Sequence, residues 1–276
     1  MKLVGIGDNV VDFYEDQGTI YPGGNALNVA VISKRNGAEK NGYIGIIGDD
    51  LEAEHILETL CHENIDTAKI RKMYGPNGKA YVALDEKGDR VFKKTNRDTR
   101  VQSKATLQLT EDDLHYIDEF EVIHTSINSN IENELPKLRY KPVSFDFSTK
   151  GKWNKDYLVK VCPFIQFAFF SGTGMKDQEI HELLKYVHTF GVKIVIVTKG
   201  GEPAVCSDGK NKYLQPPIDI EVVDTMGAGD SFIAGFLTSY FDSNDIEKAL
   251  ENAAVSAGKT CKTYGAFGYG KKIEYL

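Results

Sequence analysis

The chain has 276 residues, with 33 Lys and Arg against 40 Asp and Glu and a formal net charge of -7. This length is sufficient for one large α/β domain with a substantial core. Because the basic residues are scattered, neither nucleic acid nor an anionic membrane is indicated as a partner. The sequence has no 18-residue apolar run and opens directly on a strand-like segment, so we expect a cytoplasmic protein.

A short buried strand is predicted over residues 2–7, and a loop with two acids, Asp8 and Asp12, follows it. The Gly5-x-Gly7 pair resembles the start of a dinucleotide-binding turn, which would indicate a nicotinamide enzyme. However, Val10 stands where the third glycine is required, and residues 10–14 look extended rather than helical. The nicotinamide alternative is therefore the weaker one.

Two glycines, Gly23 and Gly24, precede a predicted helix whose first turns carry Asn25 and Asn28. Asn25 alone is an ordinary candidate for a helix N-cap. Together, the two amide side chains offer both the donors and the acceptors that sugar hydroxyls require. The residues by themselves leave both interpretations open.

The middle of the chain alternates strands and helices, with one interruption. Residues 67–95 instead contain a predicted hairpin, 80–84 and 90–92 around a turn at 85–89, which is either a small β lid or a surface hairpin. The possible hinge at Gly23 and Gly24 favours the lid. Further strands are expected at 42–47, 121–124, 142–145, 164–169 and 193–197. The strand-helix alternation predicts an α/β fold with a mainly parallel sheet.

Residues 224–237 combine a loop of small residues with an apolar helix. The Gly227-Ala228-Gly229 entry would let an anion approach the free amides of the helix N-terminus. Asp230, beside that position, either caps the helix or accepts a proton from a hydroxyl while the amides stabilise a transferred anionic group. A hydrolase using Ser231 with Asp112 and His115 is a weaker alternative, because no GxSxG elbow surrounds the serine.

The segments 23–28 and 224–235 resemble the two signatures of the ribokinase-like (PfkB) sugar kinases, in the order and spacing of that family. Within it, residues 6–12, 23–31, 145–148 and Met226 resemble the bacterial fructoselysine 6-kinases. The resemblance implies a single three-layer α/β/α domain over 1–276, with a lid from about 13–22 and 67–96. It also implies ATP-dependent phosphorylation of the 6-hydroxyl of a ketose-type sugar. The favoured substrate is fructoselysine or a related fructosamine, and fructose, or the sugar of another PfkB kinase, is the alternative.

The resemblance also implies roles for individual residues. Asp230 would be the catalytic base, with Gly227, Ala228 and Gly229 as the anion hole. The implied sugar-binding residues are Asp8, Asp12, Gly23, Gly24, Asn25, Asn28 and Arg90, and the implied ATP-binding residues are Thr198, Lys199, Gly200, Asn252, Ala253 and Ser256. Mg²⁺ is expected with ATP, and a monovalent cation such as K⁺ is expected on the backbone carbonyls of Asp224 and Met226.

Two departures from the family pattern leave alternatives open. The usual Asn-x-x-Glu motif, which serves magnesium, is replaced by 170–174, and Ala204 replaces the last glycine of the nucleotide loop. A protein that binds sugar or nucleotide without turnover is therefore a second hypothesis. Arg90 and Arg97 either contact an acidic part of the substrate or are solvated. The β lid is also the expected interface of a possible homodimer.

Overall fold

The structure, a computed structural model, describes the backbone of residues 1–84 and 90–273 and the side chains outside 84–92 and 274–276. Within these residues the larger of two sheets has nine strands, in the order β13-β12-β11-β10-β9-β8-β1-β4-β5. The strands are β1 (Lys2–Gly7), β4 (Lys40–Ile47), β5 (Arg71–Lys72), β8 (Val122–Ser126), β9 (Val143–Thr149), β10 (Phe167–Ser171), β11 (Ile194–Lys199), β12 (Glu202–Ser207) and β13 (Lys212–Gln215). All pairings from β5 to β11 are parallel, and only β12 and β13 join as antiparallel strands.

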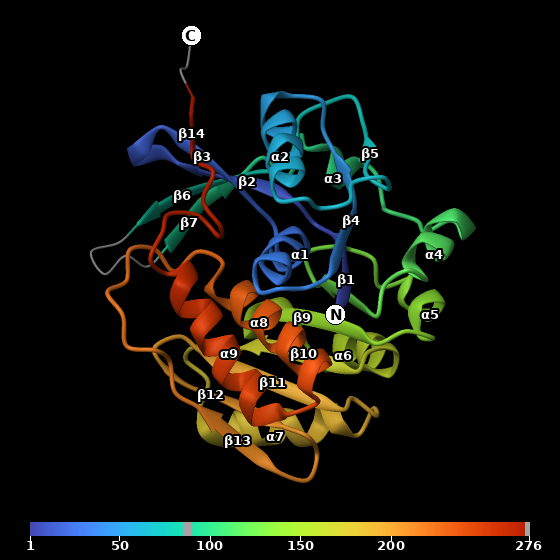
Figure 1. The fold of residues 1–276 in the computed structure, drawn as a ribbon, viewed down its shortest axis with the longest axis vertical. Helices are drawn as coiled ribbons and strands as arrows, with labels where there is room; N and C mark the ends of the chain where they lie inside the picture. Colours follow the sequence, from blue (N-terminus) through green and yellow to red (C-terminus); the bar gives the residue numbers. More distant parts are fainter. Residues whose placement is uncertain (85–89, 274–276) are drawn as a thin grey trace.

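Helices cover both faces of this sheet (Figure 1). They are α1 (Asn25–Arg35), α2 (Leu51–His62), α3 (Val101–Lys104), α4 (Glu111–Ile117), α5 (Leu135–Leu138), α6 (Lys155–Val161), α7 (Asp177–His188), α8 (Ala228–Ser243) and α9 (Ile246–Thr260). Alternate residues of β1 point to opposite faces, so Leu3 joins the core under α1, α2, α8 and α9 while Val4 joins the core under α4 to α7. This three-layer α/β/α arrangement confirms the predicted fold class.

The smaller sheet has the order β14-β3-β2-β6-β7. Its strands are β2 (Val10–Tyr14), β3 (Thr19–Gly23), β6 (Lys79–Leu84), β7 (Arg90–Thr95) and β14 (Lys271–Lys272). The set of strands in this sheet differs from that of the lid expected at 13–22 and 67–96. The segment β5 pairs instead with the open edge of β4 in the larger sheet, and β14, near the C-terminus, adds an edge strand that was not predicted.

The two sheets are connected by short segments that bring their functional ends together. β1 continues after two residues into β2, and β3 runs directly into α1 through Gly24, whose φ of 108° suits glycine. Gly5 permits α1 to lie close to β1, because a Cβ there would stand 2.3 Å from the Ala26 carbonyl oxygen. In the described part of the chain, no helix has both the length and the apolar character needed to cross a membrane.

Candidate active site

A cleft of about 2030 Å³ lies where the two sheets meet. It is lined by the carboxyl ends of parallel strands of the larger sheet, by β2, β6 and β7 of the smaller sheet, and by the start of α8. Ligands of open α/β sheets bind at this edge, since the strand ends leave a crevice there. The cleft therefore contains most of the residues that the sequence singles out.

The start of α8 faces this cleft. Gly227 is the N-cap residue with a φ of 73°, and a Cβ there would stand 2.4 Å from the Cβ of Ala266, so both the backbone and the packing require glycine. The Ala228 amide donates to the Thr225 carbonyl at 3.2 Å. A Cβ on Gly229 would meet no atom within 4 Å, because this position opens into the cleft. An anion therefore has the clearest approach at Gly229.

Asp230, in the first turn of α8, is held by both asparagines of α1. Asn25 Nδ2 donates to Asp230 Oδ1 at 2.7 Å, and Asn28 Nδ2 donates to Asp230 Oδ2 at 2.6 Å. Hydrogen bonds of this kind favour the ionised carboxylate and fix its orientation. Because one helical turn separates the two asparagines, both amides reach the same side chain.

A buried chain of hydrogen bonds orients the Asn25 amide. His124 of β8 lies 2.9 Å from Asn25 Oδ1 through Nε2 and 2.9 Å from Ser144 Oγ of β9 through Nδ1. Burial lowers the pKa of His124 to about 3, so the ring is neutral. An Nε2–H tautomer donates to Asn25 and leaves Nδ1 to accept from Ser144, which directs the Asn25 NH₂ group toward Asp230. No local pattern in the sequence marks this histidine.

Asp146 is a second acid in the cleft that the sequence did not single out. Its Oδ2 accepts from Asn25 Nδ2 at 2.8 Å, and its Oδ1 accepts from the Ser148 amide at 2.8 Å. Burial, and next the charge of Asp230, raise the pKa of Asp146 to about 7. The Phe145–Ser148 segment contributed to the family resemblance, but no role was assigned to this acid.

The two N-terminal acids have different environments. Asp8 accepts a hydrogen bond from the backbone N–H of Asn25 at 2.7 Å, at the start of α1, and another from the Ser129 hydroxyl at 2.9 Å. Much of its acceptor capacity is therefore used within the protein. Asp12 is buried and lines the cleft, and a Cβ on Gly23 would stand 2.3 Å from its Oδ2. Gly24, Asn25 and Asn28 also line the cleft. Arg90 belongs to β7, but its side chain lies outside the described residues.

Asp224 connects the smaller sheet to the approach of α8. Its buried carboxylate accepts hydrogen bonds from the Tyr14 hydroxyl of β2, from the Gly265 amide at 2.9 Å and from the Met226 amide at 2.9 Å. These bonds hold residues 224–226 against two distant parts of the chain. The carboxylate is thus occupied by protein donors.

The loop after β11 borders the cleft, as expected for Thr198, Lys199 and Gly200. The positive charge of Lys199 is balanced by two carboxylates, because its Nζ lies 2.7 Å from Glu202 and 3.4 Å from Asp177. Gly200 has a φ of 63°, which turns the loop back toward β12. The replaced motif, 170–174, ends β10 and places Ser171 and Thr173 on the wall of the cleft.

The three residues of α9 assigned to the nucleotide do not line the cleft. Asn252 donates to Ser239 of α8 at 2.9 Å, Ser256 accepts from Asn36 at 2.8 Å, and Ala253 packs beside Gly235. The cleft-facing stripe of α9, at spacing i, i+3 and i+4, lies one position after Ala253 and Ser256. The residues of α9 and its end that face the cleft are Ala254, Ala257, Gly258 and Cys261.

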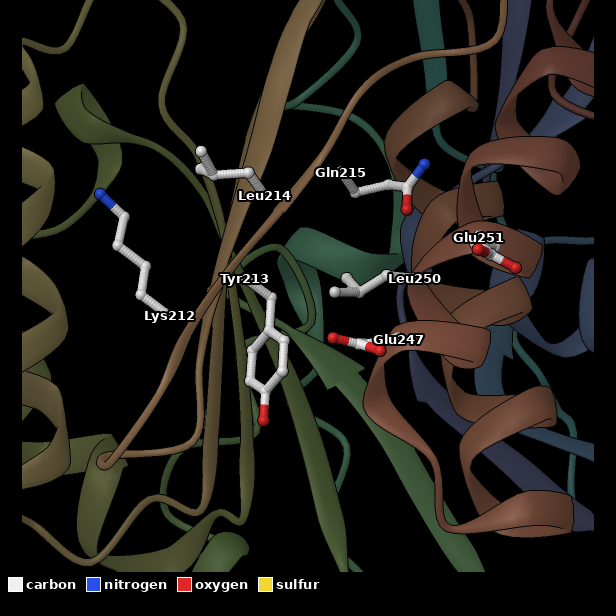
Figure 2. A pocket seen from close by; sticks show the side chains of 7 residues that line it. All are labelled: Lys212, Tyr213, Leu214, Gln215, Glu247, Leu250 and Glu251. Carbon is white, nitrogen blue, oxygen red and sulfur yellow. The ribbon is translucent and has the colours of Figure 1, made fainter.

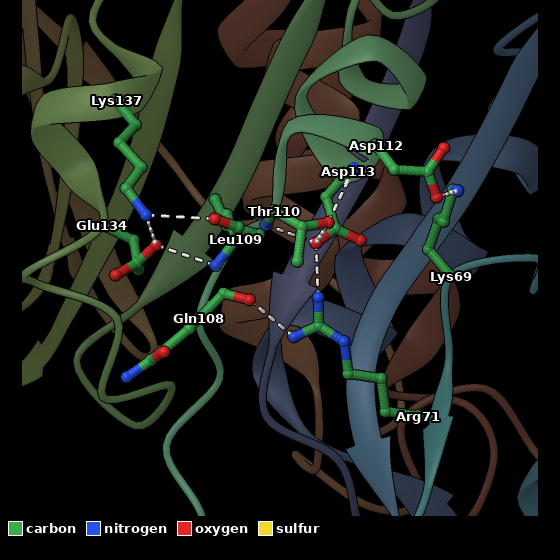
Figure 3. A network of polar contacts seen from close by, with 9 residues as sticks. All are labelled: Lys69, Arg71, Gln108, Leu109, Thr110, Asp112, Asp113, Glu134 and Lys137. Carbon is green, nitrogen blue, oxygen red and sulfur yellow. Dashed lines mark hydrogen bonds and ion pairs between the residues drawn. The ribbon is translucent and has the colours of Figure 1, made fainter.

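The serine hydrolase alternative is wrong. Ser231 is fully buried, and its hydroxyl lies 2.5 Å from the Thr260 hydroxyl. Its proposed partner Asp112 forms a surface ion pair with Lys69, beside the Arg71–Asp113 pair that links β5 to α4 (Figure 3). These groups stabilise the edge of the larger sheet and take no part in the cleft.

A second, smaller cavity of about 330 Å³ lies between β13 and α9. Figure 2 shows Tyr213 and Leu250 on facing sides of it, with Glu247 and Glu251 on the helix. None of the site residues predicted from the sequence lines this cavity. The large cleft is therefore where the sequence patterns and the structure agree.

A model of the pfkB family of carbohydrate kinases matches residues 1–139 and 169–268. The chain belongs to this family. It is 50% identical over 271 residues to "Fructosamine kinase FrlD" of Bacillus subtilis (strain 168), covering 98% of this chain and 94% of that protein. It is 33% identical over 267 residues to "Fructoselysine 6-kinase" of Escherichia coli (strain K12), covering 96% and 99%. The resemblance identified from the two signatures is confirmed.

Solved structures show the same fold for this pfkB chain. A ribokinase from Arabidopsis thaliana, complexed with ribose and ATP, has a TM-score of 0.79 at 21% identity, over 96% of this chain and 94% of that one. A putative ribokinase II from E. coli, in complex with ATP and Mg²⁺, has a TM-score of 0.78 at 20% identity with the same coverage. At these identities the likeness establishes the fold alone.

Proposed function

We propose that this protein transfers the γ-phosphoryl group of ATP to the 6-hydroxyl of a fructosamine, with Asp230 as the base. The observation that carries the proposal is the Asp230 carboxylate, held by Asn25 and Asn28 at the open N-terminus of α8 inside the cleft. Membership of a carbohydrate kinase family supports the reaction type. The names of the 50% and 33% identical relatives support the substrate class.

In this proposal the residues of the chain have separate tasks. Asp230 accepts the proton of the 6-hydroxyl as its oxygen forms a bond to the γ-phosphorus. The bond from that phosphorus to the bridging oxygen breaks, and ADP leaves with its electron pair. Amides at Gly229 and the first turn of α8 stabilise the charge that develops on the transferred group. Asp12, beside Gly23 and Gly24, binds hydroxyls of the sugar.

Mg²⁺ fits this site as a companion of the nucleotide. In the described part of the chain, no cluster of three or more His, Cys, Asp or Glu side chains is arranged to hold a metal ion. Mg²⁺ keeps several waters and binds chiefly through phosphates with one or two carboxylates, so a protein cage is not required. When bound, it neutralises charge on the phosphates. The proposal also includes a K⁺ ion bound by the backbone carbonyls of Asp224 and Met226. The smaller sheet is proposed to act as a lid that closes over the cleft, and to form the interface of a homodimer.

The direct test is Asp230→Asn, which keeps the shape of the side chain and removes the base. We expect kcat for ATP-dependent fructosamine phosphorylation to fall by about 10³-fold or more, with sugar binding largely kept. Asp242→Asn, at the exposed end of the same helix, is the matched control. Near wild-type turnover of Asp230→Asn would reject the assignment. Tight sugar binding by a wild-type protein without turnover would instead favour the binding-protein alternative.

A further inference from the structure

Two arginines line the cleft on the side of the smaller sheet. Arg97 and Arg100 belong to the connection from β7 to α3, and Arg97 is exposed while Arg100 is half-buried. This connection is ordered by its own hydrogen bonds. The Arg100 amide donates to the Asn96 carbonyl at 3.1 Å, and Asn96 Oδ1 accepts from the Lys79 amide at 2.8 Å. Both arginines are therefore held on a loop that is fastened to β6.

The strand register places these arginines beside the expected sugar site. Asp12 of β2 pairs with Ala80 of β6, and Ala80 pairs with Thr95 of β7, so the three residues lie in one row across the sheet. All three line the cleft. Arg97 follows Thr95 by two residues. Arg100 packs over the start of β6, with its Cδ 3.6 Å from the point where a Cβ on Gly78 would stand.

Neither arginine has a carboxylate within ion-pair distance among the described residues, although the charge of Asp8 acts on Arg100 from farther away. Within those residues, Arg100 Nε donates only to the Ser103 hydroxyl, at 3.0 Å. Burial, and next the charge of Arg97, lower the pKa of Arg100, and the charge of Asp8 partly opposes this shift. By contrast, Lys199 in the same cleft has two carboxylate partners. Two guanidinium groups in one cleft, with no carboxylate in ion-pair contact, favour the binding of an anion.

We propose that Arg97 and Arg100 bind a carboxylate on the amino substituent of the fructosamine. This inference rests on the proposed function and specifies its substrate class. The sugar hydroxyl would lie at Asp230, on α8, while the substituent would extend toward the smaller sheet. Guanidinium groups bind carboxylates through paired hydrogen bonds, which gives both charge and geometric selection. The protein then prefers fructosamines of amino acids to fructosamines of neutral amines.

The first experiment uses the wild-type enzyme and two fructosamines of similar size. One is made from glycine and the other from ethanolamine, so a carboxylate is exchanged for a hydroxymethyl group while both amines remain basic. We expect kcat/KM to be about 10-fold or more higher for the glycine adduct, the effect of a hydrogen-bonded charge pair. Equal kcat/KM for the two adducts would overturn the inference and leave the proposed function standing.

The second experiment measures the same ratio in Arg97→Gln, Arg100→Gln and the double variant. Each single variant should lower the ratio of glycine to ethanolamine adduct, mainly through KM, and the double variant should bring it close to one. Arg139→Gln, which removes an exposed arginine that does not line the cleft, should retain the wild-type ratio. A wild-type ratio in a folded double variant would also overturn the inference. If the enzyme phosphorylates fructose but neither of the two fructosamines, the proposed function itself is rejected.

Discussion

Asn28 Nδ2 donates a hydrogen bond of 2.6 Å to Asp230 Oδ2, although the two residues are 202 positions apart. This bond joins the second turn of α1 to the first turn of α8 and completes the fixation of Asp230 that Asn25 begins. A proposed base that is held by two amide donors is correctly oriented before substrate arrives. The predictions below test this arrangement and its surroundings.

The variant Asn28→Asp replaces a donor with a second carboxylate beside Asp230. Because like charges at this distance disfavour ionisation, the pKa of the pair should rise, and the acidic limb of the pH profile of kcat/KM should move up by about one pH unit or more. Asn28→Ala removes the donor without adding charge, so it should lower kcat/KM with a smaller shift. Identical pH profiles for the two variants would contradict the role of this bond.

Asp146 should make the stability of the protein depend on pH. Its pKa is raised from 3.8 to about 7, by burial first and the charge of Asp230 second. The folded protein thus keeps this proton where the unfolded chain loses it. The stabilising contribution is complete below about pH 3.8 and is lost as the pH rises through about 7. Stability from this group therefore falls with rising pH.

Urea unfolding of wild type and Asp146→Asn at pH 4 and pH 8 measures this effect. The variant lacks this titration, so its free energy of unfolding minus that of wild type should be larger at pH 8 than at pH 4, which means that the variant is relatively more stable at pH 8. A pKa change of one corresponds to about 1.4 kcal/mol, and we expect a difference of at least this size. Asp242→Asn, at an exposed position, should show no such trend. Parallel pH curves for wild type and Asp146→Asn would refute the prediction.

The face of α9 that borders the cleft should govern ATP affinity. Ala257→Leu introduces a larger side chain where the helix lines the cleft, so the KM for ATP should rise by several-fold to about 10-fold. Asn252→Ala, on the face that bonds to Ser239, should leave this KM within about two-fold. Steady-state kinetics with ATP as the varied substrate distinguish the two positions. The reverse order of effects would restore the assignment made from sequence.

The sequence alone determined the features that depend on local pattern. Alternating strands and helices predicted the α/β fold, and the small-residue loops at 23–28 and 224–235 indicated the family and the candidate base. These features are readable because backbone freedom at glycine, helix N-termini and apolar periodicity are properties of short segments. Asp230 and its two asparagines were named for this reason.

Only the tertiary structure decided which side chains meet. Asp146 and His124 approach Asn25 from neighbouring strands across 121 and 99 positions, and neither carries a local signal of that contact. The side of α9 that faces the cleft likewise depends on the tertiary structure, because a shift of one residue rotates a helix by roughly 100°. β5 joins the larger sheet at the edge of β4, and β14 joins the smaller sheet at the edge of β3. Which edge was open to each strand depended on the tertiary structure. Long-range packing sets these choices, and a single sequence read segment by segment does not contain it.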